Sequence, residues 1–264
     1  MRIFFAPEYP EGEYFSLALL IHQLGYSVTR SPEDDFDVGF LWQDSTHVEP
    51  PSFFREIRRS KPVLNLACVD ISKRRVEQAF QQVFGYGSFV DPATYDGRYV
   101  RKSDENAVGG GAVMDRPEAE PRDGWVYQRL VDSACDGVQV EYRTPVVLGE
   151  IPVVNVWRQE APRGPLDGRK WLETTSVQTG EIYSPQESQL ILEFCAEIGL
   201  DFGEVDVLRS REDGRLYVLD ANKTPAGYGM LNRVRWRPED KQRSLDALAR
   251  CLDRKLRALL ADDG

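Results

Sequence analysis

The chain has few of the residues that nucleophilic or zinc-dependent catalysis requires. It contains two histidines, His22 and His47, and no motif pairs either of them with a nucleophile. A histidine needs such a partner to act in catalysis, so we interpret both as structural. The four cysteines lie far apart without Cys-x-x-Cys spacing, which argues against structural zinc and a disulfide framework. These absences disfavour serine hydrolases and zinc enzymes, and they favour a reducing, cytoplasmic location.

The sequence also lacks long apolar runs. No stretch approaches the roughly 18 consecutive apolar residues of a membrane span, and the N-terminus has no signal-peptide core. A formal net charge of −10 argues against nucleic acid or an anionic membrane as a partner. With 41% hydrophobic and 29% charged residues, the composition is that of an ordinary globular protein able to bury a core.

Oxygen-bearing side chains gather in one segment near the C-terminus, residues 203–225. Apolar and β-branched residues on both sides of a turn at 211–214 predict a two-stranded hairpin. If the turn centres on Asp213, Asp206 lies opposite Asp220, because residues in a strand alternate between its faces. Asn222 then shares the face of Asp220.

Two carboxylates and an amide oxygen form part of an oxygen shell for Mg²⁺, which phosphate oxygens and water would complete. The alternative is that Asp220 and Asn222 belong to a solvated strand end, where such side chains cap their own backbone. The hairpin by itself leaves both interpretations open.

The first part of the chain alternates strand and helix, which predicts a small, mostly parallel α/β sheet. Its predicted strands are 2–6, 27–30, 36–42 and 62–68, and its predicted helices are 14–24 and 51–59. Ser72 then caps a helix that runs to about Phe84.

After residue 99 the pattern becomes α+β. Predicted strands are 99–102, 125–131, 138–147 and 151–157, followed by helices 186–198 and 238–260. The last helix has an apolar stripe that predicts core packing: Leu245, Leu248, Leu252, Leu256 and Leu259.

Lysines and a glycine loop suggest a phosphate site. Lys102 ends a strand and precedes Gly109, Gly110 and Gly111, whose backbone can lie close over phosphate oxygens. The alternative is a surface turn beside an exposed lysine. Lys73 is equally open, since a lysine in the first turn of a helix is usually solvated.

Two arginines lie on a predicted hairpin that turns at residues 148–150. Arg143 and Arg158 could direct both guanidinium groups at a transferring phosphate. Alternatively, they pair with Glu141 and Glu160 as surface charges.

Taken in this order, the parts resemble the ATP-grasp superfamily, which includes glutathione synthetase and D-alanine:D-alanine ligase. The resemblance covers nearly the whole chain and is strongest in residues 199–225. It implies a pre-ATP-grasp α/β domain at 1–70, followed by two α+β subdomains that clamp ATP. These subdomains would span 71–127 and 128–264, the latter with the terminal helix.

The resemblance also implies functions for individual residues. ATP phosphates would contact Lys73, Lys102 and the loop of Gly109, Gly110 and Gly111. The adenine hinge would be Gln128, Arg129 and Leu130, and Mg²⁺ would be held by Asp206, Asp220 and Asn222. The implied reaction is carboxylate–amine ligation through an acyl phosphate, releasing ADP and phosphate, with small-molecule or peptide carboxylates and amines as substrates.

Two departures limit this transfer. Asp220 stands where the family most often has glutamate, and Glu204 stands where several carboxylate ligases carry a positive charge. Glu204 would receive an amine or face solvent, and Tyr228 would line an acceptor pocket or belong to a turn. Two other functions stay open: an ATP-grasp kinase acting on a hydroxyl, and a non-catalytic nucleotide-binding interaction protein.

Overall fold

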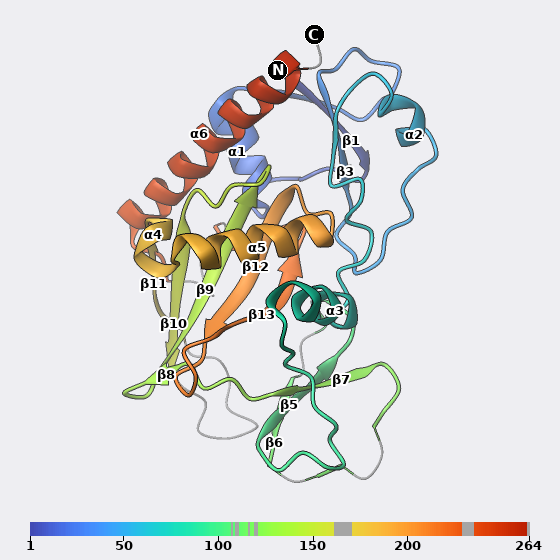
Figure 1. Ribbon diagram of the computed structural model, residues 1–264. Coiled ribbons are helices and arrows are strands. Elements are labelled where there is room, and N and C mark those ends of the chain that lie inside the picture. The colour runs from blue at the N-terminus through green and yellow to red at the C-terminus, as the bar shows by residue number, and fades with distance from the viewer. Residues whose placement is uncertain are drawn as a thin grey trace.

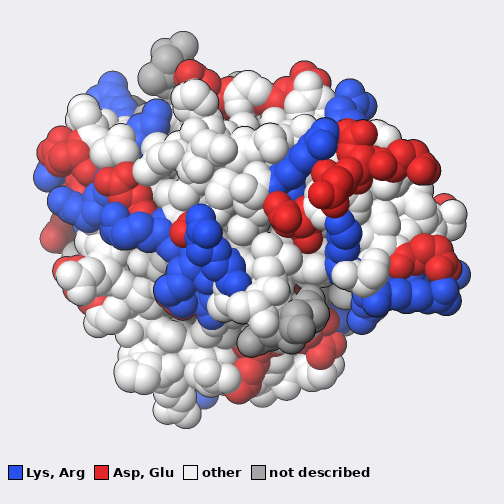
Figure 2. Space-filling view, turned by 90° about the horizontal axis from the view of Figure 1, so that it is seen from above, with Lys and Arg blue, Asp and Glu red and all other residues white. Residues whose placement is uncertain are grey.

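The described residues of the computed structural model form three sheets, which Figure 1 shows with the helices around them. The structure describes residues 1–106, 108, 111–115, 117–118, 121–160, 171–228 and 235–262. Among these residues there is no helix long and apolar enough to cross a bilayer. On the face seen in Figure 2, lysine and arginine side chains lie beside aspartate and glutamate side chains.

The N-terminal sheet is entirely parallel, in the order β2-β1-β3-β4, which confirms the predicted α/β start. Its strands are β1 (Arg2–Pro7), β2 (Ser27–Thr29), β3 (Val38–Trp42) and β4 (Val63–Leu64), and its helices are α1 (Ser16–Leu24) and α2 (Phe54–Ile57).

Two predicted elements of this part are much shorter than expected. The strand predicted over 62–68 ends after Leu64, because Asn65 adopts a left-handed backbone with φ of 56°. The helix predicted over 51–59 shrinks to α2, since its first hydrogen bonds join residues three apart and form tight turns.

A three-stranded antiparallel sheet, in the order β6-β5-β7, follows in the chain. It comprises β5 (Tyr99–Ser103), β6 (Ala112–Met114) and β7 (Trp125–Arg129). The third sheet is antiparallel in the order β11-β10-β9-β12-β13, with β8 paired to β9. Its strands are β8 (Ala134–Cys135), β9 (Val138–Val147), β10 (Val154–Glu160), β11 (Trp171–Val177), β12 (Phe202–Arg209) and β13 (Leu216–Asn222).

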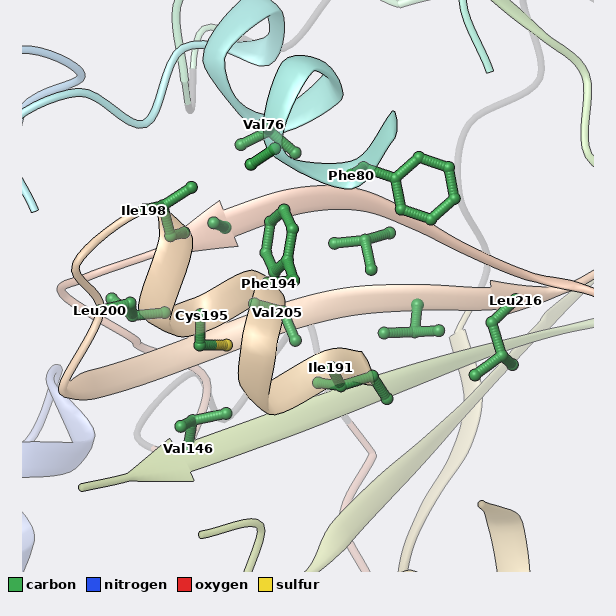
Figure 3. Packing of buried hydrophobic residues seen from close by; sticks show 14 of the residues in the cluster. Val76, Phe80, Val146, Ile191, Phe194, Cys195, Ile198, Leu200, Val205 and Leu216 are labelled. Atoms are coloured by element: carbon green, nitrogen blue, oxygen red, sulfur yellow. The ribbon is translucent and has the colours of Figure 1, made fainter. Parts of the chain in front are cut away.

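Helices cover one face of this largest sheet. They are α3 (Lys73–Phe84) and α5 (Pro185–Glu197), with the short α4 (Thr179–Ile182) before α5. Figure 3 shows Val76 and Phe80 of α3 and Phe194 of α5 in one cluster with Val205 of β12. Ser72 caps α3 as predicted, its hydroxyl accepting a hydrogen bond from the Arg75 amide at 3.3 Å. Because α3 also packs against β13, its first residue, Lys73, lies near that strand.

The terminal helix α6 (Pro238–Asp262) packs against the parallel sheet, α1 and the other face of the largest sheet. Its predicted apolar stripe is confirmed, since Leu245, Leu248, Leu252 and Leu256 are buried and Leu259 packs beside them. Because α3 and α6 each share a core with a distant part of the chain, the domain boundaries at 70 and 127 stay predictions.

Candidate functional site

The predicted hairpin and its register are confirmed. Asp206 of β12 lies directly opposite Asp220 of β13, and Glu204 lies opposite Asn222. Directly opposed residues of antiparallel strands share a face, so all four oxygen-bearing side chains lie on one face. The other face of the hairpin contributes apolar residues to the core under α3 and α5.

Arg143 joins this face from β9, where the register places it opposite Asp206. Its Nη1 donates to Asp206 Oδ1 at 2.5 Å, and its Nε lies 2.8 Å from Glu141 Oε1. The guanidinium also lies 4.3 Å from the centre of the Trp157 ring. Burial lowers the pKa of Arg143, but the facing carboxylates outweigh burial and raise that pKa above its usual range. Arg143 is thus a permanently charged partner of a site carboxylate rather than a surface charge.

Arg158 does not reach this site. The register pairs Arg143 with Asn155, and Arg158 lies three residues farther along β10. An odd spacing along a strand places two residues on opposite faces, so Arg158 lies on the face away from Asp206. There its Nη1 donates to Thr175 Oγ1 at 3.0 Å. The hypothesis that this hairpin directs both guanidinium groups at one phosphate is therefore incompatible with the strand register.

Two lysines approach Asp220 from outside the largest sheet. Lys73 Nζ lies 3.7 Å from Asp220 Oδ2 and donates to the Glu105 carbonyl at 3.1 Å. Lys102 Nζ donates to the Leu219 carbonyl at 3.4 Å. Lys73 is 8% exposed, so it is not the solvated helix-end lysine of the alternative interpretation.

Burial lowers the pKa of Lys102 to about 8, although the nearby Asp220 carboxylate acts in the opposite direction. The nearby carboxylates only partly offset the cost of burying the Lys102 ammonium, so this ammonium is suited to bind an anion. Of the glycine loop, Gly109 and Gly110 lie outside the described residues. Gly111 is described, and a Cβ added there would lie 3.7 Å from Lys102 Cβ, so the loop ends against this lysine.

The predicted hinge residues lie at the end of β7 and are engaged in internal hydrogen bonds. Gln128 is buried, and its Nε2 donates to Ser88 Oγ at 2.6 Å. The amides of Arg129 and Leu130 donate to the carbonyls of Ser88 and Arg98, at 2.8 and 3.0 Å. These hydrogen bonds hold the backbone of residues 128–130 in place, so a flat ring bound at this strand end would contact a fixed backbone.

Asn222 is used locally in this structure. Its Oδ1 accepts hydrogen bonds from the Thr224 amide at 2.9 Å and from Thr224 Oγ1 at 3.4 Å. This is the backbone capping of the alternative interpretation, so Asn222 must exchange these bonds before it can bind a metal.

Sequence reasoning missed the burial of Glu204 and Glu141 beside Arg143. Glu204 is 3% exposed, which rules out the solvent-facing interpretation, and its Oε1 lies 3.7 Å from Arg143 Nη1. Burial raises the pKa of Glu204 to about 7, with Arg143 lowering and Glu141 raising it. Burial also raises the pKa of Asp206 well above its usual range, against the effect of Arg143. A cation bound here would favour the charged forms of these buried carboxylates.

Tyr228 is a buried residue that packs between β10, α6 and Trp236. Its ring stacks on Trp236, with centroids 5.1 Å apart. Its hydroxyl accepts a hydrogen bond from Asn155 Nδ2 at 2.8 Å and lies 2.7 Å from Ser244 Oγ. These contacts hold Tyr228 against α6, and residues 229–234, which would form the predicted turn, lie outside the described residues.

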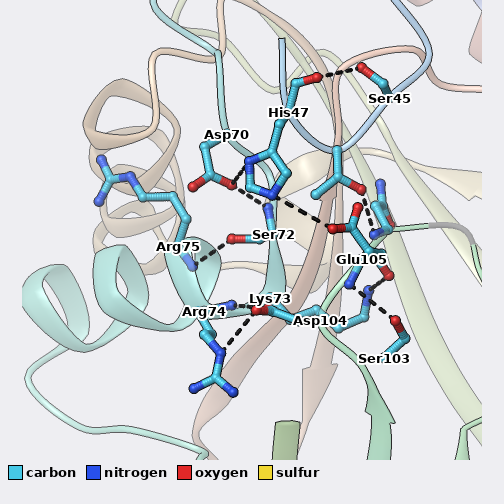
Figure 4. Close-up of polar contacts among 12 residues, drawn as sticks. Ser45, His47, Asp70, Ser72, Lys73, Arg74, Arg75, Ser103, Asp104 and Glu105 are labelled. Carbon is cyan, nitrogen blue, oxygen red and sulfur yellow. Dashed lines mark hydrogen bonds and ion pairs between the residues drawn. The ribbon is translucent and has the colours of Figure 1, made fainter. Parts of the chain in front are cut away.

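His47 lies close to the start of α3 (Figure 4). Its Nδ1 is 3.4 Å from Asp70 Oδ1 and its Nε2 is 3.8 Å from Glu105 Oε1. Asp70 in turn accepts a hydrogen bond from the Ser72 amide at 2.7 Å. The exposed His47 thus lies between Asp70 and Glu105, on the two segments next to Lys73, which agrees with a structural role.

The donor set of the site fits a hard divalent cation. In the described part of the chain, no three His, Cys, Asp or Glu side chains are arranged to hold a metal. The set here is two opposed carboxylates, Asp206 and Asp220, with the Asn222 amide nearby. Such a set suits Mg²⁺, which commonly binds through one or two carboxylates and takes its other ligands from phosphates and water.

No protein-family model matches the sequence, and no curated protein matches it. Solved structures are nevertheless similar over nearly the whole chain. The ATP-grasp ligase PsnB, complexed with a phosphomimetic variant of its minimal precursor, Mg and ADP, has a TM-score of 0.59 and 13% identity, covering 98% of each chain. D-alanine–D-alanine ligase from Bacillus anthracis has a TM-score of 0.58 and 12% identity, covering 100% of each chain.

A third similar structure is the macrocyclase MdnC from Microcystis aeruginosa MRC, bound with the precursor peptide MdnA. Its TM-score is 0.52 at 14% identity, and the match covers 96% of this chain and 100% of MdnC. At these identities the likeness concerns the fold. The chain has the ATP-grasp fold, as its sequence pattern implied.

Proposed function

We propose that this protein is an ATP- and Mg²⁺-dependent ligase that joins a carboxylate to an amine. The observation that carries the proposal is the convergence of Asp206, Asp220, Lys73 and Lys102. Carboxylates facing buried ammonium groups can hold a metal and the phosphates that the metal binds. Two of the similar structures described above, PsnB and D-alanine–D-alanine ligase, are ligases of the same fold, which supports the proposal.

In this proposal Asp206 and Asp220 hold Mg²⁺, and Asn222 joins them after releasing Thr224. The metal, when bound, neutralises charge on the phosphate oxygens. Lys73 and Lys102 bind the same phosphates. The backbone around residues 128–130 receives the adenine ring.

The reaction would proceed in two displacements. A substrate carboxylate oxygen forms a bond to the γ-phosphorus of ATP, and the bond from that phosphorus to the ADP oxygen breaks. The amine nitrogen then bonds to the carbonyl carbon of the acyl phosphate, phosphate leaves, and the nitrogen loses a proton. Arg143 is the one predicted arginine on this face, and it stabilises the transferring charge once it is released from Asp206.

We propose small-molecule or peptide carboxylates and amines as substrates. Two of the similar structures, PsnB and MdnC, were solved with precursor peptides, and a third acts on D-alanine. This range fits the proposed chemistry, because one fold positions ATP while the acceptor site varies.

The test is an ADP-release assay with Mg-ATP, a panel of amino acids and short peptides, and hydroxylamine. Hydroxylamine converts an acyl phosphate to a stable hydroxamate. Carboxylate-dependent ADP release with hydroxamate formation is the expected result. A stable phosphorylated alcohol would show a kinase instead, and Mg-ATP binding without turnover across the panel would indicate an interaction protein.

ATP affinity is expected to depend on pH through Lys102. Its pKa of about 8 in the free protein must rise when the ammonium binds phosphate. Affinity is therefore full below pH 8 and falls above it, by up to about tenfold per pH unit. Calorimetry at pH 8.5 in buffers of different ionisation enthalpy should show net proton uptake.

The matched variant is Lys102→Arg, since arginine stays protonated throughout this range. It should bind ATP with little pH dependence and without the Lys102 share of proton uptake. Equal proton uptake in parent and variant would show that Lys102 does not titrate on binding.

A further inference from the structure

A buried carboxylate connects the helix that carries Lys73 to the strand that leads into the predicted hinge. Glu77 lies on α3, four residues after Lys73 and so on the same side of the helix. It is 6% exposed. Neither the metal nor the phosphate site uses it.

The Glu77 carboxylate binds the segment between α3 and β5. Its Oε1 accepts hydrogen bonds from the amides of Ser88 and Phe89, at 2.5 and 3.0 Å. Its Oε2 accepts from Ser88 Oγ at 2.5 Å. A Cβ added at Gly87 would lie 2.8 Å from Glu77 Oε1, so the backbone approaches the carboxylate as closely as only glycine allows.

The same segment is bonded to β7. Ser88 Oγ accepts from Gln128 Nε2 at 2.6 Å, and the Ser88 carbonyl accepts from the Arg129 amide at 2.8 Å. Phe89 also forms a bridge with Gln128. An unbroken chain of hydrogen bonds thus runs from α3 through Glu77 and Ser88 to the hinge strand.

We propose that Glu77 is a positioning residue that sets the spacing between the phosphate side and the adenine side of the nucleotide site. This inference rests on the proposed function. ATP must reach Lys73 with its phosphates and residues 128–130 with its base, so it binds well only when α3 and β7 keep this spacing. A ligand that has phosphates and no base is indifferent to the spacing.

The test compares ATP with inorganic tripolyphosphate, each titrated calorimetrically with Mg²⁺ into parent and Glu77→Gln. The variant keeps the size of the side chain but replaces one acceptor oxygen with a donor that faces other donors. ATP affinity should fall at least about tenfold, while tripolyphosphate affinity stays within about twofold. The exposed Glu193→Gln on α5 is the matched control and should change neither.

A second variant serves if Glu77→Gln folds poorly. Ser88→Ala removes the hydroxyl between Glu77 and Gln128 while the backbone bonds remain, and it should show the same selective loss at about threefold or more. An equal loss of both ligands, or no loss of either, in a folded variant would overturn the inference. Failure of the parent to bind ATP at all would instead overturn the proposed function, and the inference with it.

Discussion

Replacing Asp220 with alanine should weaken Mg-ATP binding by about 100-fold, or about 2.7 kcal/mol. Asp220 supplies one of the two opposed carboxylates of the site, and its removal leaves Asp206 alone opposite an apolar residue. Mg²⁺ held by few protein ligands depends strongly on each carboxylate. Calorimetric titration with ATP in the presence and absence of Mg²⁺ measures the effect.

The magnesium-free titration is the control, because no loss of affinity is expected there. Asp220 lies 3.7 Å from Lys73, so its removal frees this ammonium for phosphate and takes away a repelling charge. ATP without Mg²⁺ should bind the variant as well as the parent or better. Asp220→Asn, which keeps the shape of the side chain, should resemble Asp220→Ala. An equal loss with and without Mg²⁺ would point to damage to the fold instead.

Replacing Asn65 with alanine should destabilise the protein by about 3 kcal/mol. Asn65 is fully buried between the parallel sheet and the start of β12. Its Oδ1 accepts from the amides of Asp201 and Phe202, each at 2.9 Å, and its Nδ2 donates to the Phe202 carbonyl at 2.8 Å. Alanine leaves these three backbone groups without their partner. Urea denaturation gives the free energy of unfolding.

Asn65→Gly separates the two causes of this loss. Asn65 has φ of 56°, a conformation that glycine adopts without strain and alanine does not. If the side-chain hydrogen bonds dominate, the glycine variant should be nearly as unstable as the alanine variant. Stability near that of the parent would show that backbone strain, and not hydrogen bonding, makes alanine costly.

The hairpin that carries Asp206 and Asp220 could be predicted because its determinants are local. A turn centre near Asp213 and the alternation of strand faces suffice to place the two carboxylates opposite each other. The terminal helix was predictable for the same reason, since its leucines recur at helical spacing.

The face on which Arg158 lies also follows from local determinants. A turn over residues 148–150 pairs residue 143 with residue 155, which is the observed register. Residues 155 and 158 then face opposite sides of the sheet. The presence of an arginine on each strand is therefore not sufficient, because the parity of the two positions decides whether they share a face.

Other features depend on contacts that no local pattern contains. The burial of Glu204 beside Arg143 and Glu141 depends on the pairing of β12 with β9, and the network of Glu77 joins residues far apart in the chain. Asn65, whose left-handed backbone ends β4, bonds to Asp201 and Phe202, a contact across more than half of the sequence. Alternation and spacing cannot reveal such partners.

The most direct test of the central claim is calorimetric titration of the unmodified protein with ATP, with and without Mg²⁺. The account predicts saturable binding that is at least about tenfold tighter with Mg²⁺, because Asp206 and Asp220 hold the metal that the phosphates bind. Asn222→Ala should lose part of this metal dependence. Absence of ATP binding by the folded protein, or binding that ignores Mg²⁺, would contradict the assignment of this face as a nucleotide site.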